Sequence, residues 1–546
     1  MFILAIFLLY INIILYNAVL RCEMSTEIWW KECVVYQIYL RSFQDSNGDG
    51  IGDLQGIIRR LGYLNELGIG CIWLSPVYPS PNKDFGYDVS DYCAIHEDFG
   101  TMDDMDELLE KAHALGIKVI LDMVLNHTSI QHPWFIESRK GGESNPYKDY
   151  YLWVREPNNW MACFGGGAFT WDECRREFYM HSFLPQQPDL NWRNPATVED
   201  IFKQCRFWLD KGIDGFRLDV INCIIKDENL RFNPRVGGLR HIRPYDRQIH
   251  VFDRNRPETH RRLQDFRKMV DQYPDRMLVG EIMVESPGEP EMASSYLGDE
   301  LNLTFDFSLL QARFNASLWG KVAKRWYAAV GNENWPTWVL NNHDVHRSIS
   351  RFKGNERKAR LSAMFIMTQK GTPFIYYGEE LGMPDSSISH KEMVDPLGKH
   401  YYPLPVGRDS ERNPMLWDMS TGFGFSDTKP WIPYAPEGCT HSVAYEEKFK
   451  NSMLSYYKQL IALRKKDNVI LYGEIEFVEM KEKSILAYYR ILETGKRLVL
   501  LNFSRKSVSL ILPDAGATPL LSSFGQVVID KGKVTLSGFQ AAVFKV

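Results

Sequence analysis

Four short carboxylate-bearing segments, each at the end of an apolar run, constrain the fold of this 546-residue chain most strongly. They span residues 122–127 (DMVLNH), 215–222 (GFRLDVIN), 279–283 (VGEIM) and 339–345 (VLNNHDV). Each begins as a buried β-strand would begin and ends in polar residues. The strands of a parallel barrel end at one face, where their last side chains surround a pocket. The segments therefore predict a parallel barrel with acidic groups gathered at one mouth.

Eight β-rich stretches alternate with amphipathic helical stretches from residue 34 onward. The expected strands span residues 34–40, 71–77, 118–125, 215–220, 277–283, 301–307, 337–341 and 374–377. Between them, apolar residues recur at helical spacing, as in 54–67 and 356–368. This alternation predicts a (β/α)₈ TIM barrel in the α/β class. An open doubly wound sheet is the competing architecture, which the lack of a Gly-rich phosphate loop after the first strand disfavours.

Changes in composition divide the chain into four parts. After the third strand comes a long stretch rich in Gly, Asn, Trp and Tyr, which indicates an inserted subdomain. The last 80 residues show short β-rich runs separated by turns, which indicates an all-β domain. The expected parts are an N-terminal signal peptide or anchor (1–22), a barrel (28–127 and 185–466), an inserted subdomain (128–184) and a C-terminal β-sandwich (467–546).

Overall charge and the N-terminal segment bound the partners and the location. The formal net charge is -5, so the sequence offers no basic surplus for nucleic acid. Residues 2–20 are almost wholly apolar, which predicts a cleaved secretory signal or, alternatively, an uncleaved anchor. We therefore expect an extracellular protein that meets a membrane only if this segment is retained. The oligomeric state stays open.

Two further expectations follow from a secretory context. Cys163 and Cys174 flank a Gly-rich stretch and could close a disulfide-bonded hairpin. Asn302, Asn315 and Asn502 lie in N-x-[ST] sequons and are candidate glycosylation sites.

A Gly-rich loop after the first strand carries oxygen donors at alternate positions. We predict a structural cation site there, formed by the side chains of Asp45, Asn47, Asp49 and Asp53 and the carbonyl of Ile51. Hard cations need several oxygen ligands, so Ca²⁺ is favoured and Mg²⁺ is possible. A solvated loop of Asx-turns is the alternative interpretation.

Two carboxyl groups fall at the ends of the fourth and fifth expected strands. A retaining glycosidase needs a pair roughly 5–5.5 Å apart, and Asp219 and Glu281 are placed to form one. Arg217 lies two residues before Asp219, on the same strand face, where its charge would keep Asp219 ionised. The neighbouring charge would raise the pKa of Glu281, as a general acid requires. Asp344, at the seventh strand end, could favour a cationic transition state.

The chain resembles the α-amylase family, glycoside hydrolase family thirteen, on its α-glucosidase branch. The resemblance runs from about Trp29 to the C-terminus. It is carried by the four strand-end segments, the loop that begins at Asp45, the motif GYDVSD at 86–91 and the motif QPDLN at 187–191. It implies that Asp219 is the nucleophile, Glu281 the acid/base and Asp344 the transition-state stabiliser, with Arg217 orienting the nucleophile.

The resemblance also implies how the terminal glucose is held. Tyr87 would stack under the ring, while His127 and His343, otherwise readable as core histidines, would bind its hydroxyls. Asp84 and Arg412 would grip the non-reducing end and block deeper subsites. Val220 resembles its counterpart in relatives that accept α-1,6 bonds or sucrose.

The expected function is therefore that of an exo-acting, retaining α-glucosidase. Its substrates would be short α-glucosides such as maltose, sucrose or isomaltose-type sugars, cleaved through a covalent glucosyl–aspartate. Two alternatives stay open. One is a transglucosylase or trehalose-forming enzyme, and the other is a non-catalytic protein similar to amino-acid transporter heavy chains.

Overall fold

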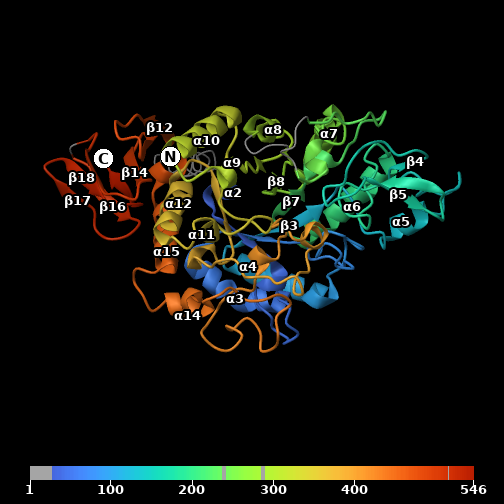
Figure 1. Ribbon diagram of the computed structural model, residues 1–546, viewed down its shortest axis with the longest axis horizontal. Coiled ribbons are helices and arrows are strands. Elements are labelled where there is room, and N and C mark those ends of the chain that lie inside the picture. The colour runs from blue at the N-terminus through green and yellow to red at the C-terminus, as the bar shows by residue number, and fades with distance from the viewer. Residues whose placement is uncertain (1–27, 237–241, 285–288, 515) are drawn as a thin grey trace, which may run out of the picture.

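The computed structural model describes residues 28–236, 242–284, 289–514 and 516–546 (Figure 1). The expected signal peptide or anchor, residues 1–22, lies outside the described residues. None of the helices in the described part of the chain has the length and apolar composition needed to cross a membrane.

Eight parallel strands form a nearly closed barrel at the centre of the molecule. Their order is β10-β11-β1-β2-β3-β7-β8-β9. The gap between β9 and β10 is bridged by the Thr337 hydroxyl, which donates to the Thr304 carbonyl at 2.7 Å. The strands are β1 (Val35–Ile38), β2 (Cys71–Leu74), β3 (Lys118–Val124), β7 (Gly215–Asp219), β8 (Met277–Gly280), β9 (Leu303–Thr304), β10 (Thr337–Val339) and β11 (Thr372–Tyr376). This arrangement confirms the predicted barrel.

Amphipathic helices cover the barrel and begin and end where local chemistry dictates. The Asp53 side chain caps α3 by accepting from the Gly56 N–H, and Gly68 ends that helix with a φ of 91°. The main helices are α3 (Leu54–Leu67), α4 (Met102–Ala114), α6 (Pro195–Lys211), α7 (Pro257–Val270), α10 (Ala316–Val330), α12 (Glu356–Thr368) and α15 (Met453–Lys466). Shorter helices are α2 (Trp29–Glu32), α5 (Pro133–Ser138), α8 (Pro290–Ser294), α9 (Ser308–Gln311), α11 (Ser348–Arg351), α13 (Pro396–Tyr401), α14 (Val443–Glu446) and α16 (Asn468–Tyr472).

The segment that follows β3 forms a small antiparallel sheet beside the barrel. Its strands are β4 (Trp153–Val154), β5 (Phe169–Asp172) and β6 (Glu177–Met180), in the order β4-β6-β5. Antiparallel bridges between His127 and Asp189 and between Tyr151 and Leu190 tie it to the end of β3. Because of these bridges, the subdomain is fixed against the carboxyl ends of the barrel strands.

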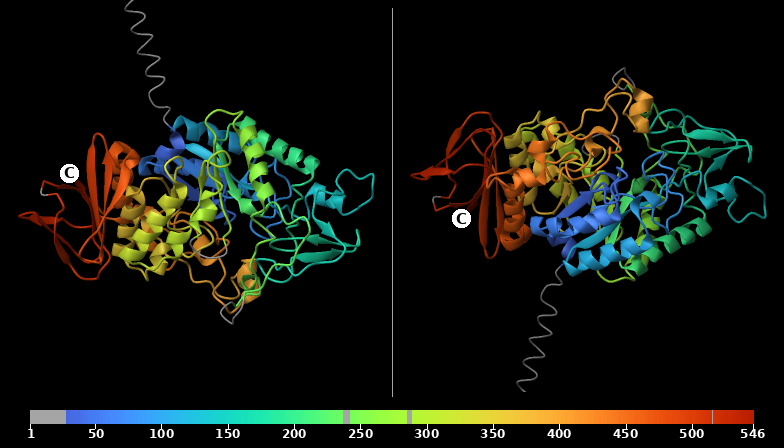
Figure 2. Two further views of the ribbon diagram at one scale, coloured as in Figure 1. Left: turned by 90° about the horizontal axis from the view of Figure 1, so that it is seen from above. Right: turned by 90° about the horizontal axis from the view of Figure 1, so that it is seen from below.

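The C-terminal part is all-β, as expected. One sheet has the order β12-β13-β14-β19-β16 and the other β15-β18-β17. The strands are β12 (Glu474–Val478), β13 (Ile485–Leu492), β14 (Gly495–Asn502), β15 (Val508–Ile511), β16 (Thr518–Ser522), β17 (Val528–Asp530), β18 (Lys533–Leu536) and β19 (Ala541–Lys545). Figure 2 shows this domain and the β4–β6 subdomain at opposite ends of the barrel. The C-terminal domain is therefore too distant to line a pocket that the subdomain helps to form.

The structure contradicts the expected Cys163–Cys174 disulfide and one of the three expected glycosylation sites, Asn502. Cys163 and Cys174 are both free thiols, because Cys163 packs in an apolar cluster while Cys174 is exposed in the β5–β6 turn. Asn502 is fully buried, and its amide donates to the carbonyls of Lys506 and Ser537, both at 2.9 Å. A side chain so enclosed has no room for a glycan.

Candidate active site

Arg217 joins three carboxylates at the carboxyl ends of neighbouring strands. Its Nη1 donates to Asp122 Oδ1 at 2.7 Å and to Asp219 Oδ1 at 2.8 Å, while its Nη2 contacts Glu281 Oε2. The guanidinium is 1% exposed, so these contacts are shielded from water. One planar, permanently charged group therefore holds Asp219 and Glu281 side by side.

Strand register explains why these two acids meet. Leu218 of β7 pairs with Gly280 of β8, so the next residues of the two strands are Asp219 and Glu281. The Ile221 N–H donates to the Glu281 carbonyl at 3.0 Å and closes the strand ends together. Directly after Asp219, Val220 has a φ of 34°, which is rare for a β-branched residue. Backbone strain of this kind is typical of functional sites.

A second group of contacts organises the opposite wall. The Tyr87 hydroxyl donates to Asp122 Oδ2 at 3.0 Å and lies 2.7 Å from His343 Nε2. The Tyr87 and His343 rings are stacked, with centroids 5.5 Å apart and an interplanar angle of 5°. Gln37 contacts the other ring nitrogen of His343 at 2.7 Å. The two rings are thus fixed in orientation before any ligand arrives.

Two arginines hold Asp344, and they correct one sequence-based pairing. Arg412 Nη2 donates to Asp344 Oδ1 at 2.9 Å, and Arg408 Nη1 donates to the same oxygen at 3.2 Å. The sequence named Asp84 and Arg412 together as sugar-binding residues, but in the structure the ion pair with Asp84 is formed by Arg408 Nη2, at 2.7 Å. Arg412 instead lies behind Asp344 and donates to the His343 carbonyl at 2.8 Å.

The charges of the site favour one retained proton between Asp219 and Glu281. Burial raises the pKa of Asp219; Arg217 opposes this shift, and Glu281 and Asp122 add to it. Burial also raises the pKa of Glu281, again against Arg217. The expected rise for Glu281 is therefore seen, whereas Arg217 does not lower the pKa of Asp219 below its usual range. A single guanidinium cannot neutralise three carboxylates at once.

Asp344 and the two histidines have the opposite tendencies. Burial alone would raise the pKa of Asp344, but His343, Arg408 and Arg412 outweigh it and hold that pKa well below its usual range. Burial lowers the pKa of His343 to about 3 and that of His127 to about 4. At neutral pH the site therefore presents an ionised Asp344 beside uncharged imidazoles.

These side chains surround a pocket of about 470 Å³. Seven of the nine residues predicted for catalysis or sugar binding line it, whereas Arg217 and Arg412 lie just behind the wall. The lining comprises Asp84, Tyr87, His127, Cys163, Phe164, Phe183, Asp219, Val220, Arg243, Glu281, Met283, His343, Asp344, Leu397, Val406 and Arg408. One side of the pocket is polar, and the side formed by Phe164, Val220, Met283 and Leu397 is apolar.

Gln187, in the QPDLN motif, connects two of the predicted sugar-binding residues. Its Nε2 donates to Asp84 Oδ2 at 3.1 Å and lies 3.1 Å from His127 Nε2. Gln187 is fully buried, so these contacts are shielded from water.

A buried ion pair also attaches the QPDLN segment, residues 187–191, to the residues that follow β3 and β7. Lys226 Nζ contacts Asp189 Oδ2 at 2.6 Å and donates to Asn126 Oδ1 at 2.6 Å. Lys226 and Asp189 side chains are both 0% exposed. Such a pair holds the two segments together strongly. Separating the charges would leave each one buried without water or a partner, which is costly.

Sequence reasoning missed Asp122, Arg408, Gln187 and Lys226. Asp122 and Gln187 lie inside motifs that the sequence analysis named. A polar residue within the apolar run of β3, and another at the start of the QPDLN motif, could have indicated a role in the site. Arg408 lies four residues before Arg412 in an irregular segment, where no periodicity distinguishes the two arginines.

The predicted cation loop wraps its oxygen atoms inward around its own backbone. Asp45 Oδ1 accepts from the Gly48 N–H at 2.7 Å and Asp45 Oδ2 from the Gly50 N–H at 2.8 Å. Asp49 Oδ1 accepts from the Ile51 N–H at 2.7 Å. Asp45 and Asp53 are buried, whereas Asn47 and Asp49 are exposed. The donor set consists of oxygen atoms only, which fits a hard cation.

A parallel barrel with paired acids in a pocket at its carboxyl end defines the glycosidase class of site, and comparisons place the chain within that class. Residues 37–473 match the model of the alpha amylase catalytic domain, and residues 485–543 match the alpha-amylase SusG C-terminal domain. The chain is 40% identical to an oligo-1,6-glucosidase of Bacillus cereus, over 95% of this chain and 99% of the relative. It is also 40% identical to a probable alpha-glucosidase of Rhizobium meliloti (strain 1021), over 90% and 92%.

A solved structure extends this likeness to three dimensions. The crystal structure of an alpha-glucosyl transfer enzyme superposes with a TM-score of 0.90 at 37% identity, covering 95% of this chain and 99% of the other. The chain belongs to the α-amylase family, glycoside hydrolase family thirteen, which confirms the resemblance drawn from its motifs.

Breaking the buried pair that fastens the QPDLN segment should destabilise the fold. We expect Lys226→Met to lower the free energy of unfolding by about 3–5 kcal/mol, because Asp189 would keep a buried, uncompensated charge. Chemical denaturation measures the change. The matched control is Lys140→Met, which removes an exposed partner of Glu137 and should cost less than about 1 kcal/mol. Equal effects of the two variants would contradict the assigned role of Lys226.

Proposed function

We propose that this protein is an exo-acting, retaining α-glucosidase that releases glucose from the non-reducing end of short α-glucosides. The observation that carries the proposal is the pairing of Asp219 and Glu281 on one guanidinium at the wall of the pocket. The names of the relatives, oligo-1,6-glucosidase and probable alpha-glucosidase, support the same substrate class.

The chemistry would proceed by two displacements at the anomeric carbon. In the first, an Asp219 oxygen attacks this carbon while Glu281 donates its proton to the glycosidic oxygen, so that the leaving group departs as an alcohol. In the second, Glu281 removes a proton from water, the resulting hydroxide attacks the glucosyl–Asp219 ester, and α-glucose leaves. The retained proton between the two acids is what the first step requires.

The other wall would stabilise the sugar ring as it gains positive charge. Asp344 stays ionised between its arginines, so it can accept hydrogen bonds from ring hydroxyls and favour the cation. Neutral His343 and His127 line the pocket without adding a positive charge that would repel the developing cation. Tyr87, stacked on His343, offers a ring face to the C–H groups of glucose.

The Asp84–Arg408 ion pair supports exo-action. It lies on the pocket wall, and Arg408 Nη2 is 2.7 Å from Asp84 Oδ1. The same nitrogen is also 2.7 Å from Asp395 Oδ1. A bound glucose would meet a charged, hydrogen-bonding barrier at its non-reducing end. Longer chains therefore have no path deeper into the pocket, and short substrates are favoured.

A transglucosylase is the second candidate, and the apolar side of the pocket favours it. Phe164, Val220, Met283 and Leu397 form one apolar cluster on the pocket wall, and we place the leaving group against it. Such a wall holds an organic alcohol better than water and could let it accept glucose in the second step. The structurally similar alpha-glucosyl transfer enzyme is consistent with this option. A non-catalytic transporter partner would have no use for three acids in one pocket.

Secretion and glycosylation remain part of the proposal. The apolar N-terminal stretch is the observation that supports an exported chain. Asn315 is exposed and caps α10 through its Oδ1, which leaves its amide nitrogen available for a glycan. Asn302 is half-buried and accepts from the Leu278 N–H at 2.8 Å, so Asn315 is the better site.

We further propose that the loop of Asp45, Asn47, Asp49, Ile51 and Asp53 holds a structural Ca²⁺. Burial raises the pKa of Asp53, an effect that a bound dication would offset. The ion would fix the loop against the α3 N-terminus, which Asp53 caps. Mg²⁺ would fit less well, because its octahedral shell tolerates less irregularity.

Removing either acid should abolish turnover in distinguishable ways. We expect Asp219→Asn to lower kcat on maltose, isomaltose and sucrose by at least about 10³-fold, because no nucleophile remains. Glu281→Gln should fail on the same sugars but keep much more activity on α-glucosyl fluoride, whose leaving group needs no proton. Initial rates and the anomer released, followed by NMR, measure both effects. Asp530→Asn, on exposed β17, is the control. Full glucose release by Asp219→Asn would refute the proposal.

Replacing the shared guanidinium should shift the pH profile. In Arg217→Lys a single ammonium cannot contact all three carboxylates, so the pKa of Asp219 rises further. The nucleophile must be ionised, and activity is lost as pH falls through its pKa, so the acidic limb of kcat/KM should move to higher pH. The rate at the optimum should fall by about 10²-fold. Arg59→Lys, on the exposed face of α3, should leave the profile unchanged. An unmoved acidic limb in Arg217→Lys would contradict this account of the charges.

Calcium should stabilise the chelator-treated protein. We expect added Ca²⁺ to raise the thermal midpoint by about 2 °C or more, and Mg²⁺ to raise it less. Asp49→Asn should weaken the response, while the control Asp530→Asn should keep it. If Ca²⁺ does not raise the thermal midpoint of the native protein, the cation proposal is wrong and the loop is a set of Asx-turns.

A further inference from the structure

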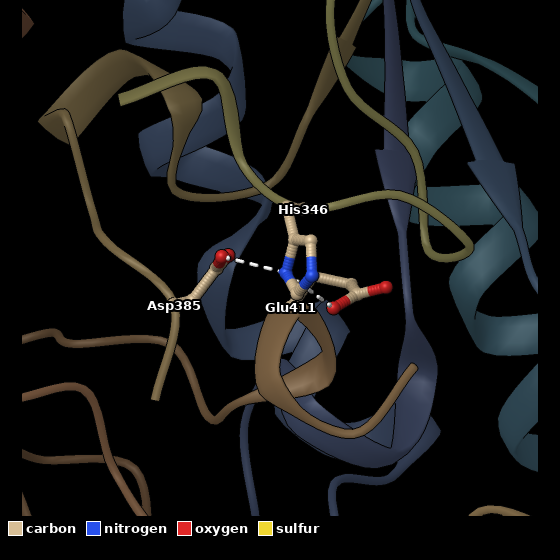
Figure 3. A group of neighbouring side chains, drawn as sticks. All are labelled: His346, Asp385 and Glu411. Atoms are coloured by element: carbon tan, nitrogen blue, oxygen red, sulfur yellow. Dashed lines mark hydrogen bonds and ion pairs between the residues drawn. The ribbon is translucent and has the colours of Figure 1, made fainter. Parts of the chain in front are cut away.

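A second polar cluster lies next to the catalytic pocket but does not line it. His346, Asp385 and Glu411 come from three separate segments and turn toward one another (Figure 3). His346 follows β10, Asp385 lies after β11, and Glu411 belongs to a short 3₁₀ helix, Ser410–Arg412. Their potential ligand atoms all lie within 4.8 Å of one another.

The oxygen atoms of this cluster gather around one ring nitrogen. His346 Nδ1 lies 3.0 Å from Asp385 Oδ2, 3.5 Å from Glu411 Oε2 and 3.2 Å from Ser410 Oγ. A proton on Nδ1 can point well at only one of these acceptors. With metal–ligand bonds of about 2.0–2.2 Å and tetrahedral angles, two ligand atoms lie about 3.3–3.6 Å apart. The distances from Nδ1 are close to this spacing, and all the ligand atoms lie within 4.8 Å of one another, near enough to converge on one small cation.

Burial and charge point the same way. The Glu411 side chain is 2% exposed and that of Asp385 is 14% exposed, whereas His346 is half-exposed. Two carboxylates exceed the charge of one imidazolium, while a dication beside a neutral imidazole would balance them. The exposed edge of His346 provides a path for the ion.

We propose that His346 Nδ1, Asp385 and Glu411 bind one divalent cation of the Zn²⁺ class. One imidazole nitrogen and two carboxylate oxygens are a donor set that Zn²⁺ accepts, with Ser410 or water as the fourth ligand. Ca²⁺ is disfavoured because it requires six or more oxygen ligands. This site is separate from the oxygen-only loop at Asp45.

The position of the cluster gives such an ion a consequence for the pocket. Glu411 directly precedes Arg412, which donates to Asp344, and Asp344 lies two residues before His346. An ion would therefore tie together the segments that carry Asp344 and its arginine. This inference does not depend on the proposed reaction, because its test measures metal binding and stability.

The test titrates ZnCl₂ alone into the chelator-treated, full-length protein and follows heat and bound metal. We expect one Zn²⁺ per chain at this site, and a thermal midpoint raised by about 2 °C at saturation. His346→Ala should weaken that binding by at least tenfold, and Glu411→Gln should do the same. The matched control is His390→Ala, an exposed histidine in the segment after β11 that also carries Asp385; this variant should bind Zn²⁺ as the native protein does.

The outcomes separate cleanly. Loss of one Zn²⁺ in His346→Ala, with retention in His390→Ala, supports the site even if buried Glu411→Gln fails to fold. Unchanged Zn²⁺ binding in folded His346→Ala would show that the metal binds elsewhere and would overturn the proposal. Absence of Zn²⁺ binding to the native protein would overturn it too. The cluster would then be an ion pair between protonated His346 and the two carboxylates.

Discussion

The contact of Arg217 with three carboxylates is the constraint on which the site depends. Asp122, Asp219 and Glu281 would repel one another in a buried pocket, and only a charge among them lets the strands end so close together. Because that one charge is insufficient, a proton is retained. Because one positive charge faces three carboxylates, one acid of the catalytic pair keeps its proton and can act as the acid, while the other can act as the nucleophile.

The barrel makes this arrangement possible because its paired strands hold the charged side chains at fixed positions. Register between β7 and β8 places Asp219 beside Glu281, and the return segment 187–191 carries Gln187 to Asp84 and His127. Positions on paired strands vary little, so the charges meet at distances that loops alone would not maintain. The inserted subdomain and the loop after β11 then close the pocket above them.

The sequence predicted the barrel well because buried parallel strands leave a plain signal of apolar runs with polar ends. All eight expected strands overlap observed ones, and three acids named from strand ends reach one pocket. It failed where long irregular segments fold back. Arg408 and Arg412 are equivalent in sequence, and only the path of the loop selects Arg408 for Asp84. The burial of Asn502 and the packing of Cys163 likewise depend on neighbours that are distant in the chain.

The central claim is that Asp219 forms a covalent bond to glucose while Glu281 supplies and removes the proton. It is tested most directly by incubating the protein with 5-fluoro-α-D-glucosyl fluoride, which slows the second displacement, and mapping the labelled peptide by mass spectrometry. The account predicts one label per chain, on Asp219, with loss of activity that recovers as the label is released. A label on Glu281 or Asp344, or turnover of natural substrate without any covalent intermediate, would contradict it.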